Sequence, residues 1–225
     1  INQKVTFNIN GVFYYRFTGD DGVAKLTISL WPGEYILTAM HPNGQARANL
    51  VKVLPPLITS DLIKYYKNDS QFSVKVIKPD GSVAGAGEKV TFNINGVFYT
   101  RITGNDGIAT LKISLRPGNY IITSMYNDYA VGNNVTVLPT LITKNLDMKY
   151  LDGSSFTAQT VDGQGNPLAN QNVSFNVNGV FYHKVTDNNG IAKLGIRLMS
   201  GEYIITSIWN DYQVGNTIKI AWKEV

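Results

Sequence analysis

The chain has 225 residues, of which 44% are hydrophobic and 16% are charged, and it contains no cysteine. This length allows one large or two to three small domains, and the lack of cysteine excludes disulfides, thiol catalysis and thiolate metal sites. The net charge of +4 comes from scattered lysines and arginines, which predicts an ordinary solvated surface and no nucleic-acid partner. No apolar run is long enough to span a bilayer, and the first residues show no signal-peptide pattern.

A repeat of domain size is the strongest feature of the sequence. Three copies of one motif occur, with Phe7, Phe92 and Phe175 in equivalent positions about 85 residues apart. A period this long indicates tandem domains and not the short turns of a solenoid. The repeats predict three domains, at residues 1–54, 55–138 and 139–225.

The first repeat begins in the middle of the pattern. Lys4 matches Lys89, and no residue ahead of Ile1 matches the stretch from Phe72 to Glu88. We therefore expect residues 1–54 to be an incomplete domain that lacks its first strands and exposes strand edges. Either this domain is truncated from a longer array, or a second chain donates the missing strands.

The second repeat can be followed strand by strand. Val90, Phe92 and Ile94 alternate with polar residues, which is typical of a strand with one buried face. Asn95-Gly96 then predicts a two-residue hairpin turn of type I′. The strands expected in this repeat cover residues 63–66, 72–77, 90–94, 97–99, 111–115, 120–123 and 133–138.

The third repeat has the same hairpin signal at Asn178-Gly179. About seven strands per complete repeat, with no helix, predict an all-β fold of tandem immunoglobulin-like β-sandwich domains. Tyr35, Tyr120 and Tyr203 each follow a turn glycine at the start of a late strand. They resemble the tyrosine corner of such sandwiches, in which the phenol hydrogen-bonds to nearby backbone.

Short joints that contain proline connect the repeats. They read VLPPLITSDL from Val53 and VLPTLITKNL from Val137. Such segments are too short to be flexible tethers, so we expect neighbouring domains to stack end to end as a fairly stiff rod.

The repeated motifs also resemble a known family. Each unit carries V-x-F-N-x-N-G-V-F-Y, T-x-x-x-G-I-A-x-L-x-I and P-G-x-Y-I-I-T, with small departures. This pattern resembles the repeated Ig-like domains of adhesin-like cell-surface proteins of methanogenic archaea, and it is similar to bacterial repeats of the invasin type. The resemblance covers the whole chain and implies an extracellular stalk or adhesin, without indicating a receptor.

The same resemblance implies a candidate crosslink. Such repeats sometimes carry a Lys-Asn isopeptide bond between their first and last strands, promoted by a buried acid. Lys64 and Lys149 lie in the segments IKYY and MKYL, and Asn133 and Asn216 precede the final strands. No acid is evidently inward in both repeats, and the alternative is that the lysines are solvated edge residues and the asparagines turn residues.

A loop before the last strand gathers aromatic and acidic side chains. Its members are Tyr126, Asp128 and Tyr129 in the second repeat and Trp209, Asp211 and Tyr212 in the third. Rings beside a carboxylate suit stacking on a sugar or a protein surface. The alternative is that these aromatics pack against the neighbouring domain.

Other motifs point to few functional groups. Three sequons, at Asn68, Asn134 and Asn172, are candidate N-glycosylation sites. His41 and His183 lie at non-equivalent positions, so we expect neither a Ser-His-Asp device nor a histidine metal site, and no cofactor.

These features together predict a non-enzymatic adhesin or stalk fragment that projects binding determinants from a cell. The alternatives are a carbohydrate- or protein-binding module that uses the loop aromatics, or an accessory domain of a secreted wall-active enzyme. The expected location is extracellular, at the cell surface. The expected partners are neighbouring modules of a longer chain or a strand donated by another chain, and a surface ligand of unknown identity.

Overall fold

The computed structural model describes residues 1–222, and they form strands, turns and irregular segments without any helix. The all-β prediction is thereby confirmed. Two compact units are present. The first contains Ile1–Ile58, Lys75–Glu88 and Thr103–Ile108, and the second contains Thr59–Val74, Lys89–Ile102 and Ala109–Val225. Residues 223–225, the end of the third predicted domain, lie outside the described part.

Residues 1–222 contain no apolar helix of membrane-spanning length.

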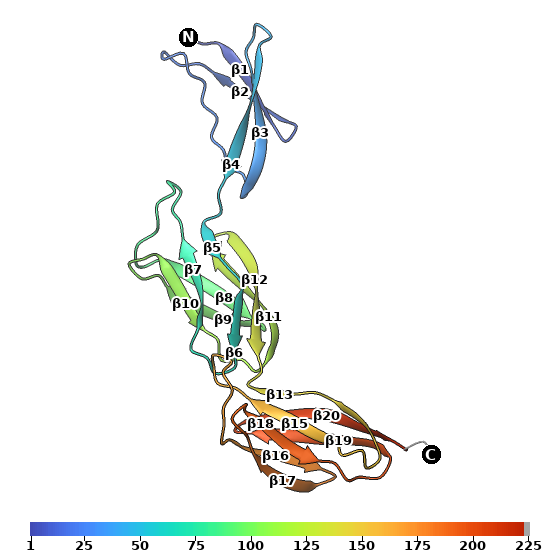
Figure 1. Cartoon of the computed structure of the whole chain (residues 1–225). Coiled ribbons are helices and arrows are strands. Elements are labelled where there is room, and N and C mark those ends of the chain that lie inside the picture. Colours follow the sequence, from blue (N-terminus) through green and yellow to red (C-terminus); the bar gives the residue numbers. More distant parts are fainter. Residues whose placement is uncertain (223–225) are drawn as a thin grey trace. The chain divides into compact units, whose positions relative to one another are not determined.

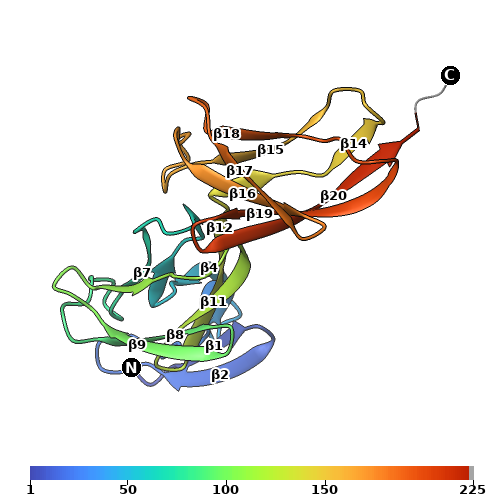
Figure 2. The ribbon, with the colours of Figure 1, turned by 90° about the horizontal axis from the view of Figure 1, so that it is seen from below.

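The third repeat belongs wholly to the second unit and forms two sheets. One sheet has the strand order β13-β15-β18, and the other has the order β14-β20-β19-β16-β17. Figures 1 and 2 show β15 and β18 in one layer and β16, β17, β19 and β20 in the other. The strands are β13 (Leu141–Thr143), β14 (Leu146–Lys149), β15 (Ser155–Thr160), β16 (Asn172–Val177), β17 (Val180–Val185), β18 (Ile191–Gly195), β19 (Gly201–Trp209) and β20 (Tyr212–Ala221).

These sheet orders are those of an immunoglobulin-like sandwich. In strand letters, β15 and β18 are B and E, while β20, β19, β16 and β17 are G, F, C and C′. The first strand is split, because β13 joins the B-E sheet and β14 joins the other sheet beside β20. Counting β13 and β14 as two halves of one strand gives the seven strands that the sequence predicts.

Alternating apolar residues of both sheets build the core of this repeat. Phe156 on β15 and Phe175 on β16 are fully buried, and their rings meet edge to face with centroids 5.8 Å apart. Ile205 on β19 and Ile218 on β20 lie in the same cluster. Since the two phenylalanines come from opposite sheets, their contact holds the layers together.

Local turn chemistry also follows the sequence. Asn178 and Gly179 both have positive φ, at 52° and 81°, as a type I′ turn between β16 and β17 requires. The Tyr203 hydroxyl donates a hydrogen bond to the carbonyl of Met199 over 3.0 Å while its half-buried ring packs on the core. The tyrosine-corner prediction is thereby confirmed.

The second repeat has the same two strand orders as the third. Its sheets are β10-β7-β5 and β6-β12-β11-β8-β9. Its strands are β5 (Leu57–Thr59), β6 (Leu62–Tyr65), β7 (Gln71–Val76), β8 (Lys89–Ile94), β9 (Val97–Ile102), β10 (Ile108–Lys112), β11 (Gly118–Tyr126) and β12 (Tyr129–Leu138). The strand expected at 111–115 therefore begins and ends three residues earlier than predicted.

The first repeat forms a single four-stranded sheet of order β2-β1-β3-β4. Its strands are β1 (Lys4–Ile9), β2 (Val12–Phe17), β3 (Gly33–Met40) and β4 (Ala46–Val53). The equivalent of β18 is irregular here, because β18 pairs with β15 and repeat one has no equivalent of β15 among the described residues. Phe7 is only half-buried, whereas Phe92 and Phe175 are fully buried in the complete repeats.

We predict that Gly190→Ala destabilises the third repeat more than Gly179→Ala does. Both glycines have positive φ, but a Cβ on Gly190 would lie 2.5 Å from the Thr160 carbonyl oxygen, whereas one on Gly179 would meet nothing within 4 Å. The extra clash is worth roughly 1–3 kcal/mol of unfolding free energy. Urea unfolding followed by the fluorescence of buried Trp209, with Trp31 and Trp222 replaced by Phe, measures the difference. Equal losses of unfolding free energy in the two variants would show that the positive φ, and not the clash at Gly190, determines the cost.

Candidate functional site

Histidine and acidic side chains do not form a metal-binding cluster in the described part of the chain. No group of three or more His, Asp or Glu side chains that could hold a metal is found in residues 1–222. His183 instead makes a 2.8 Å hydrogen bond with the Ser174 hydroxyl on the outer face of its sheet. The features that stand out are a buried lysine, a pair of inter-strand anchors and a contact between two turns, all within the second unit.

The buried lysine is Lys64 on β6. Its side chain is 4% exposed, and its Nζ donates to the backbone carbonyls of Asn68, Ser70 and Ile113 at 2.5, 3.1 and 2.8 Å. Burial lowers the pKa of Lys64, and the charge of Asp69 partly offsets that effect. The ammonium therefore serves as a donor that satisfies three carbonyls at this end of the sandwich.

The strand register gives Lys64 a different counterpart from the one that the sequence suggested. Lys64 pairs with Val137 on β12, and in the third repeat Met148 pairs with the equivalent Ile220 on β20. The segments IKYY and MKYL suggested that Lys64 and Lys149 are equivalent, but the strand register shows that they are not. A shift of one residue along a strand reverses the face, which is why Met148 is buried and Lys149 is exposed.

Asn133, the second partner of the predicted isopeptide bond, does not approach Lys64. It lies four residues before Val137 on β12, which is about 13 Å along the strand. Its amide instead donates to Asp61 Oδ1 over 3.2 Å. The structure therefore does not bring these two residues together.

The corresponding pair in the third repeat is also apart. Lys149 is exposed and pairs in register with Ala221. Asn216 lies five residues earlier on β20 and donates its amide to Asn145 Oδ1 over 3.2 Å. The Lys-Asn crosslink stays a prediction, with its partners held apart in both repeats.

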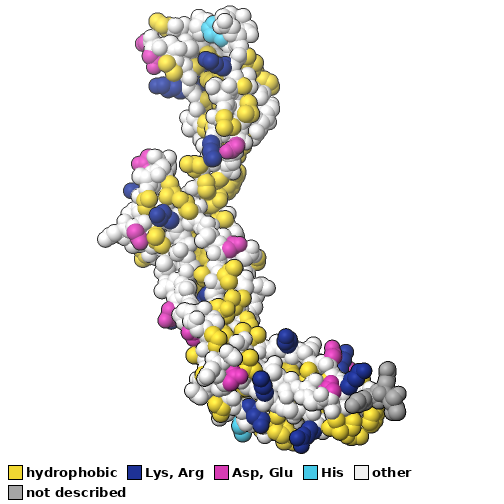
Figure 3. Space-filling model, in the orientation of Figure 1, with side chains coloured by type: hydrophobic (Ala, Val, Ile, Leu, Met, Phe, Trp, Pro, Cys, Tyr) yellow, Lys and Arg dark blue, Asp and Glu magenta, His cyan; other side chains and the backbone are white. Residues whose placement is uncertain are grey.

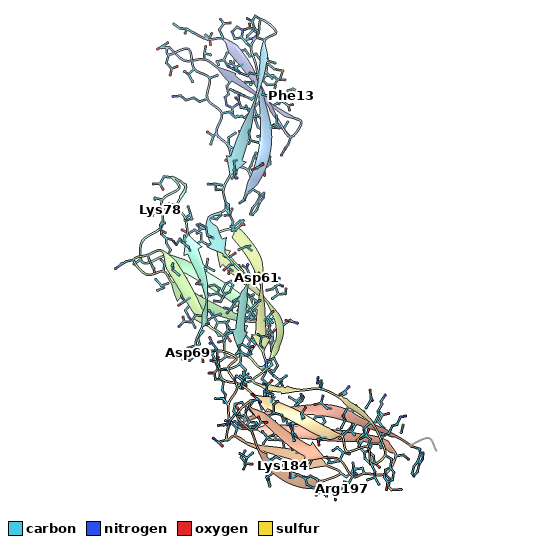
Figure 4. All side chains as sticks on the ribbon, in the orientation of Figure 1. Phe13, Asp61, Asp69, Lys78, Lys184 and Arg197 are labelled. Carbon is cyan, nitrogen blue, oxygen red and sulfur yellow. The ribbon has the colours of Figure 1, made fainter. Side chains whose placement is uncertain are left out.

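Asp61 is an anchor that ties the start of β6 to β12. Its carboxylate accepts the backbone N–H of Asn134 over 2.9 Å and the side-chain amides of Asn133 and Asn134, each over 3.2 Å (Figure 4). The backbone hydrogen bond from Asn134, followed by the two amides, lowers the pKa of Asp61. In the third repeat, Asn145 Oδ1 takes the same place and accepts the backbone N–H of Thr217 over 3.0 Å.

The anchors stand at the beginning of a parallel strand pair. β6 runs parallel to β12 from Leu62 opposite Val135, and β14 runs parallel to β20 from Leu146 opposite Ile218. The ladder continues past the strand ends, because Tyr66 donates to Leu138 and Tyr150 to Ala221, each over 2.8 Å. The first and last strands of each complete repeat are thus joined over their whole shared length.

The loop of the third repeat with the predicted binding aromatics meets the β6–β7 turn of the second. Lys67 Nζ lies 2.7 Å from Asp211 Oδ1, and the rings of Tyr66 and Tyr212 are tilted with centroids 5.7 Å apart. This ion pair lowers the pKa of Asp211 and raises that of Lys67. Because both side chains are more than half exposed, the ring contact matters more to stability than the charges do.

A second contact in the same place involves the turn after β15. Asn68 donates its amide to the Gly163 carbonyl over 2.7 Å. Gly165, with φ at 86°, faces the ring of Tyr65 so closely that a Cβ would lie 2.6 Å from its hydroxyl. Together with the Tyr66–Tyr212 pair, these contacts form a joint between the second and third repeats, which we call the turn joint.

The six loop residues therefore divide into two groups. In the third repeat, Trp209 is buried at 9% exposure and belongs to the core, while Asp211 and Tyr212 belong to the turn joint. In the second repeat, Asp128 is exposed and Tyr126 and Tyr129 are half-buried and already engaged in contacts. In the third repeat, the positions of Trp209 and Tyr212 agree with the alternative that these aromatics pack within the array.

The three sequons differ in how their asparagine amides are used. The Asn68 amide is bound to Gly163 in the turn joint, and the Asn134 amide is bound to Asp61. Asn172 is exposed at the start of β16. Of the three, Asn172 is the most accessible acceptor for a glycan, and glycosylation stays a prediction.

We expect the intact mass of the chain to equal the mass of its sequence. Each Lys-Asn isopeptide bond releases one ammonia, and the distances from Lys64 to Asn133 and from Lys149 to Asn216 do not allow the bond to form in this arrangement. High-resolution mass spectrometry of the intact, freshly purified chain makes the measurement. A deficit of one or two ammonia masses would contradict the expectation.

We further predict that Asp61→Asn, which installs the residue of the third repeat, weakens the second repeat only where Asp61 is ionised. The pKa of Asp61 is lowered in the folded state, so its stabilisation is present at neutral pH and is lost as the pH falls through that lowered pKa. Urea midpoints, followed by hydrogen exchange of β12 peptides, should differ between variant and wild type at neutral pH and converge in acid. A difference in urea midpoint that does not change with pH would show that the charge of Asp61 does not contribute to stability.

No family model matches the chain. Comparison with solved structures finds a Bacteroides ovatus protein of a mixed-linkage glucan utilization locus, in complex with a mixed-linkage heptasaccharide, at 16% identity and a TM-score of 0.30. The match covers 98% of this chain and 61% of that one, so this chain spans about three fifths of its length.

Two further similar structures are tandem or adhesin proteins. The I9–I11 tandem of titin matches at 18% identity and a TM-score of 0.33, over 97% of this chain and 88% of that one. A 1.5-MDa bacterial ice-binding adhesin matches at 15% identity and a TM-score of 0.26, and the match covers 99% of this chain and 87% of that one. These TM-scores are too low for the likenesses to carry an argument about function.

Proposed function

We propose that this chain is a load-bearing, non-enzymatic segment of a cell-surface stalk. The observation that carries the proposal is the parallel pairing of the first and last strands in both complete repeats. The assignment to a cell surface, and to adhesin-like proteins of archaea in particular, rests on the repeated sequence motif.

Parallel pairing of the end strands determines how tension acts on a repeat. In the second repeat, β5 and β6 form the split first strand, the chain leaves at the end of β12, and β6 and β12 point the same way. A pull on the two ends therefore draws β6 and β12 in opposite directions along their common axis. Their hydrogen bonds are loaded together and must break together, whereas strands pulled apart from one end lose their bonds one at a time.

The turn joint adds to this proposal. Only Pro139 and Thr140 separate β12 from β13, which leaves little free chain between the repeats. Tyr66, Lys67 and Asn68 then contact the next repeat through a ring pair, an ion pair and a hydrogen bond. A short link with such contacts passes tension from one repeat to the next with little slack.

The alternative of a binding module is less well supported. It would use Trp209, Asp211 and Tyr212, of which the first is buried and the others lie in the turn joint. Using them for a sugar or a protein would mean breaking those contacts. A stalk makes use of the same residues as they stand.

We predict that the third repeat resists force much better between its ends than across its hairpin. In single-molecule force spectroscopy, the chain is held either by its termini or by cysteines in the double variant Asn172→Cys and Val185→Cys. These two residues are opposite each other at the open end of the β16–β17 pair, so force applied there unzips the strands one bond at a time. The unfolding force should be several times higher when the chain is held by its termini.

A matched control is the quadruple variant that adds Asn145→Ala and Asn216→Ala to the two cysteines, because it removes the two side chains of the β14–β20 anchor and leaves the hairpin intact. It should lower the force measured between the termini and leave the unzipping force unchanged. Equal forces in the two pulling directions for the parent protein would overturn the load-bearing proposal.

A further inference from the structure

Every repeat has an edge strand, next to the strand with the central phenylalanine, that is paired on one side only among the described residues. β2, β9 and β17 each stand at the end of their sheet order, so only one side of each is paired among the described residues (Figure 1). All three follow an Asn-Gly turn and begin with the same residues, Val-Phe-Tyr. An open edge strand is a template for pairing with another chain, and natural proteins normally shield it.

The backbone groups on the open side can be identified from the hairpin turn. In a two-residue turn, the N–H of Val180 bonds back to the carbonyl of Val177, and alternate residues of β17 then also bond to β16. Thr186, in the same alternation, bonds to Gln171 over 2.9 Å. The N–H and C=O groups of the intervening residues, Phe181, His183 and Val185, therefore point away from the sheet.

The same alternation holds in the other repeats. Thr103 bonds to Glu88 and Thr18 bonds to Gln3, at 2.9 and 3.0 Å. The residues that present open backbone groups are accordingly Phe98, Thr100 and Ile102 in β9 and Phe13, Tyr15 and Phe17 in β2.

The first and last of these three residues in each strand are apolar, and their side chains are more than half exposed. Phe98 is 64% exposed, Val185 is 63% exposed and Phe17 is 60% exposed. Hydrophobic side chains are accordingly visible on the surface of the repeats (Figure 3). These residues belong neither to the core nor to the turn joint. Because exposed apolar residues recur at the same positions in all three repeats, we expect them to contact a partner outside the repeat.

The strand β17 is complementary to itself in one antiparallel register. With His183 opposite His183 of a second copy, Phe181 lies opposite Val185, and Tyr182 lies opposite Lys184. Every open backbone group then meets an open group, because only residues with the same alternation are paired. An apolar pair forms on the outer face, and a cation–aromatic pair forms on the inner face.

The corresponding register gives the same kinds of pairs in the other repeats. In β9 it pairs Thr100 with itself, Phe98 with Ile102 and Tyr99 with Arg101. In β2 it pairs Tyr15 with itself, Phe13 with Phe17 and Tyr14 with Arg16. The apolar and cation–aromatic pairs are thus kept although the residues at these positions differ.

We propose that each of these edge strands can pair antiparallel with the same strand of a second copy of this chain, so that one such strand pair joins two chains. The basic residue in each strand could instead shield the edge, as edge lysines do in monomeric proteins. Against shielding stands the position of that residue, which is opposite a tyrosine in all three registers. Arg101 already lies over the ring of Tyr99 in its own strand, with 5.8 Å to the centroid, so the pair is compatible with this surface. Figure 4 labels Phe13 and Lys184, which belong to two of these strands.

A cysteine crosslink tests the register. The chain has no cysteine, so His183→Cys creates a single thiol that should face its copy at about 5.5 Å between Cα atoms, within disulfide range. Val180→Cys is the matched control, because Val180 is also exposed on the same strand but would lie about 20 Å from its copy in this register. After mild oxidation of the full chain, the disulfide-linked dimer should be roughly tenfold more abundant for His183→Cys, given that geometry.

A second measurement keeps the proposal falsifiable without a crosslink. The backbone N–H groups that the triple variant Tyr15→Pro, Thr100→Pro and His183→Pro removes all face the open side, so the strand pairing within each sheet is kept and circular dichroism should stay that of the wild type. In sedimentation equilibrium, the mass of the wild type should rise with concentration, and the mass of the triple variant should stay that of one chain. A wild type that remains monomeric up to about 1 mM would overturn the proposal. So would equal crosslinking at residues 180 and 183, which would place any association on another surface.

Discussion

Each complete repeat is closed by a chain segment that crosses from one sheet to the other. In the third repeat, β13 pairs with β15 in the smaller sheet, and a few residues later β14 pairs with β20 in the larger one. The hydrogen bonds of one short segment therefore hold both layers and both ends of the repeat. In the first repeat, whose described residues contain no equivalents of β13, β14 and β15, the segment equivalent to β18 is irregular and Phe7 is only half-buried.

The parts of this fold that depend on neighbours in sequence could be predicted well. The Asn-Gly turns and the tyrosine corner require only a few adjacent residues, and both occur where the sequence places them. The all-β fold class could also be predicted, because apolar and polar residues alternate along each single strand. These features are determined by local backbone preference, which a sequence displays directly.

Pairing between distant strands was predicted less well. Lys64 and Lys149 look equivalent because each precedes a tyrosine, yet the true reference points are Asp61 and Asn145, which contact β12 and β20 more than 70 residues away. A single-residue error in register exchanged a buried position for an exposed one. The turn joint could not be predicted for the same reason, since Tyr66 and Tyr212 meet only after both repeats have folded.

The parallel contact between first and last strands also affects how the chain is made. During synthesis, β14 leaves the ribosome long before β20, and 71 residues separate the anchor residues Asn145 and Asn216. Contacts over such a separation form slowly, because the entropy of closing the loop must be overcome first. Until the last strand arrives, the first strand of one repeat can pair with the matching strand of its neighbour, which is a common route to misassembly in tandem proteins. The low sequence identity between LIKY of β6 and LDMK of β14 works against that exchange.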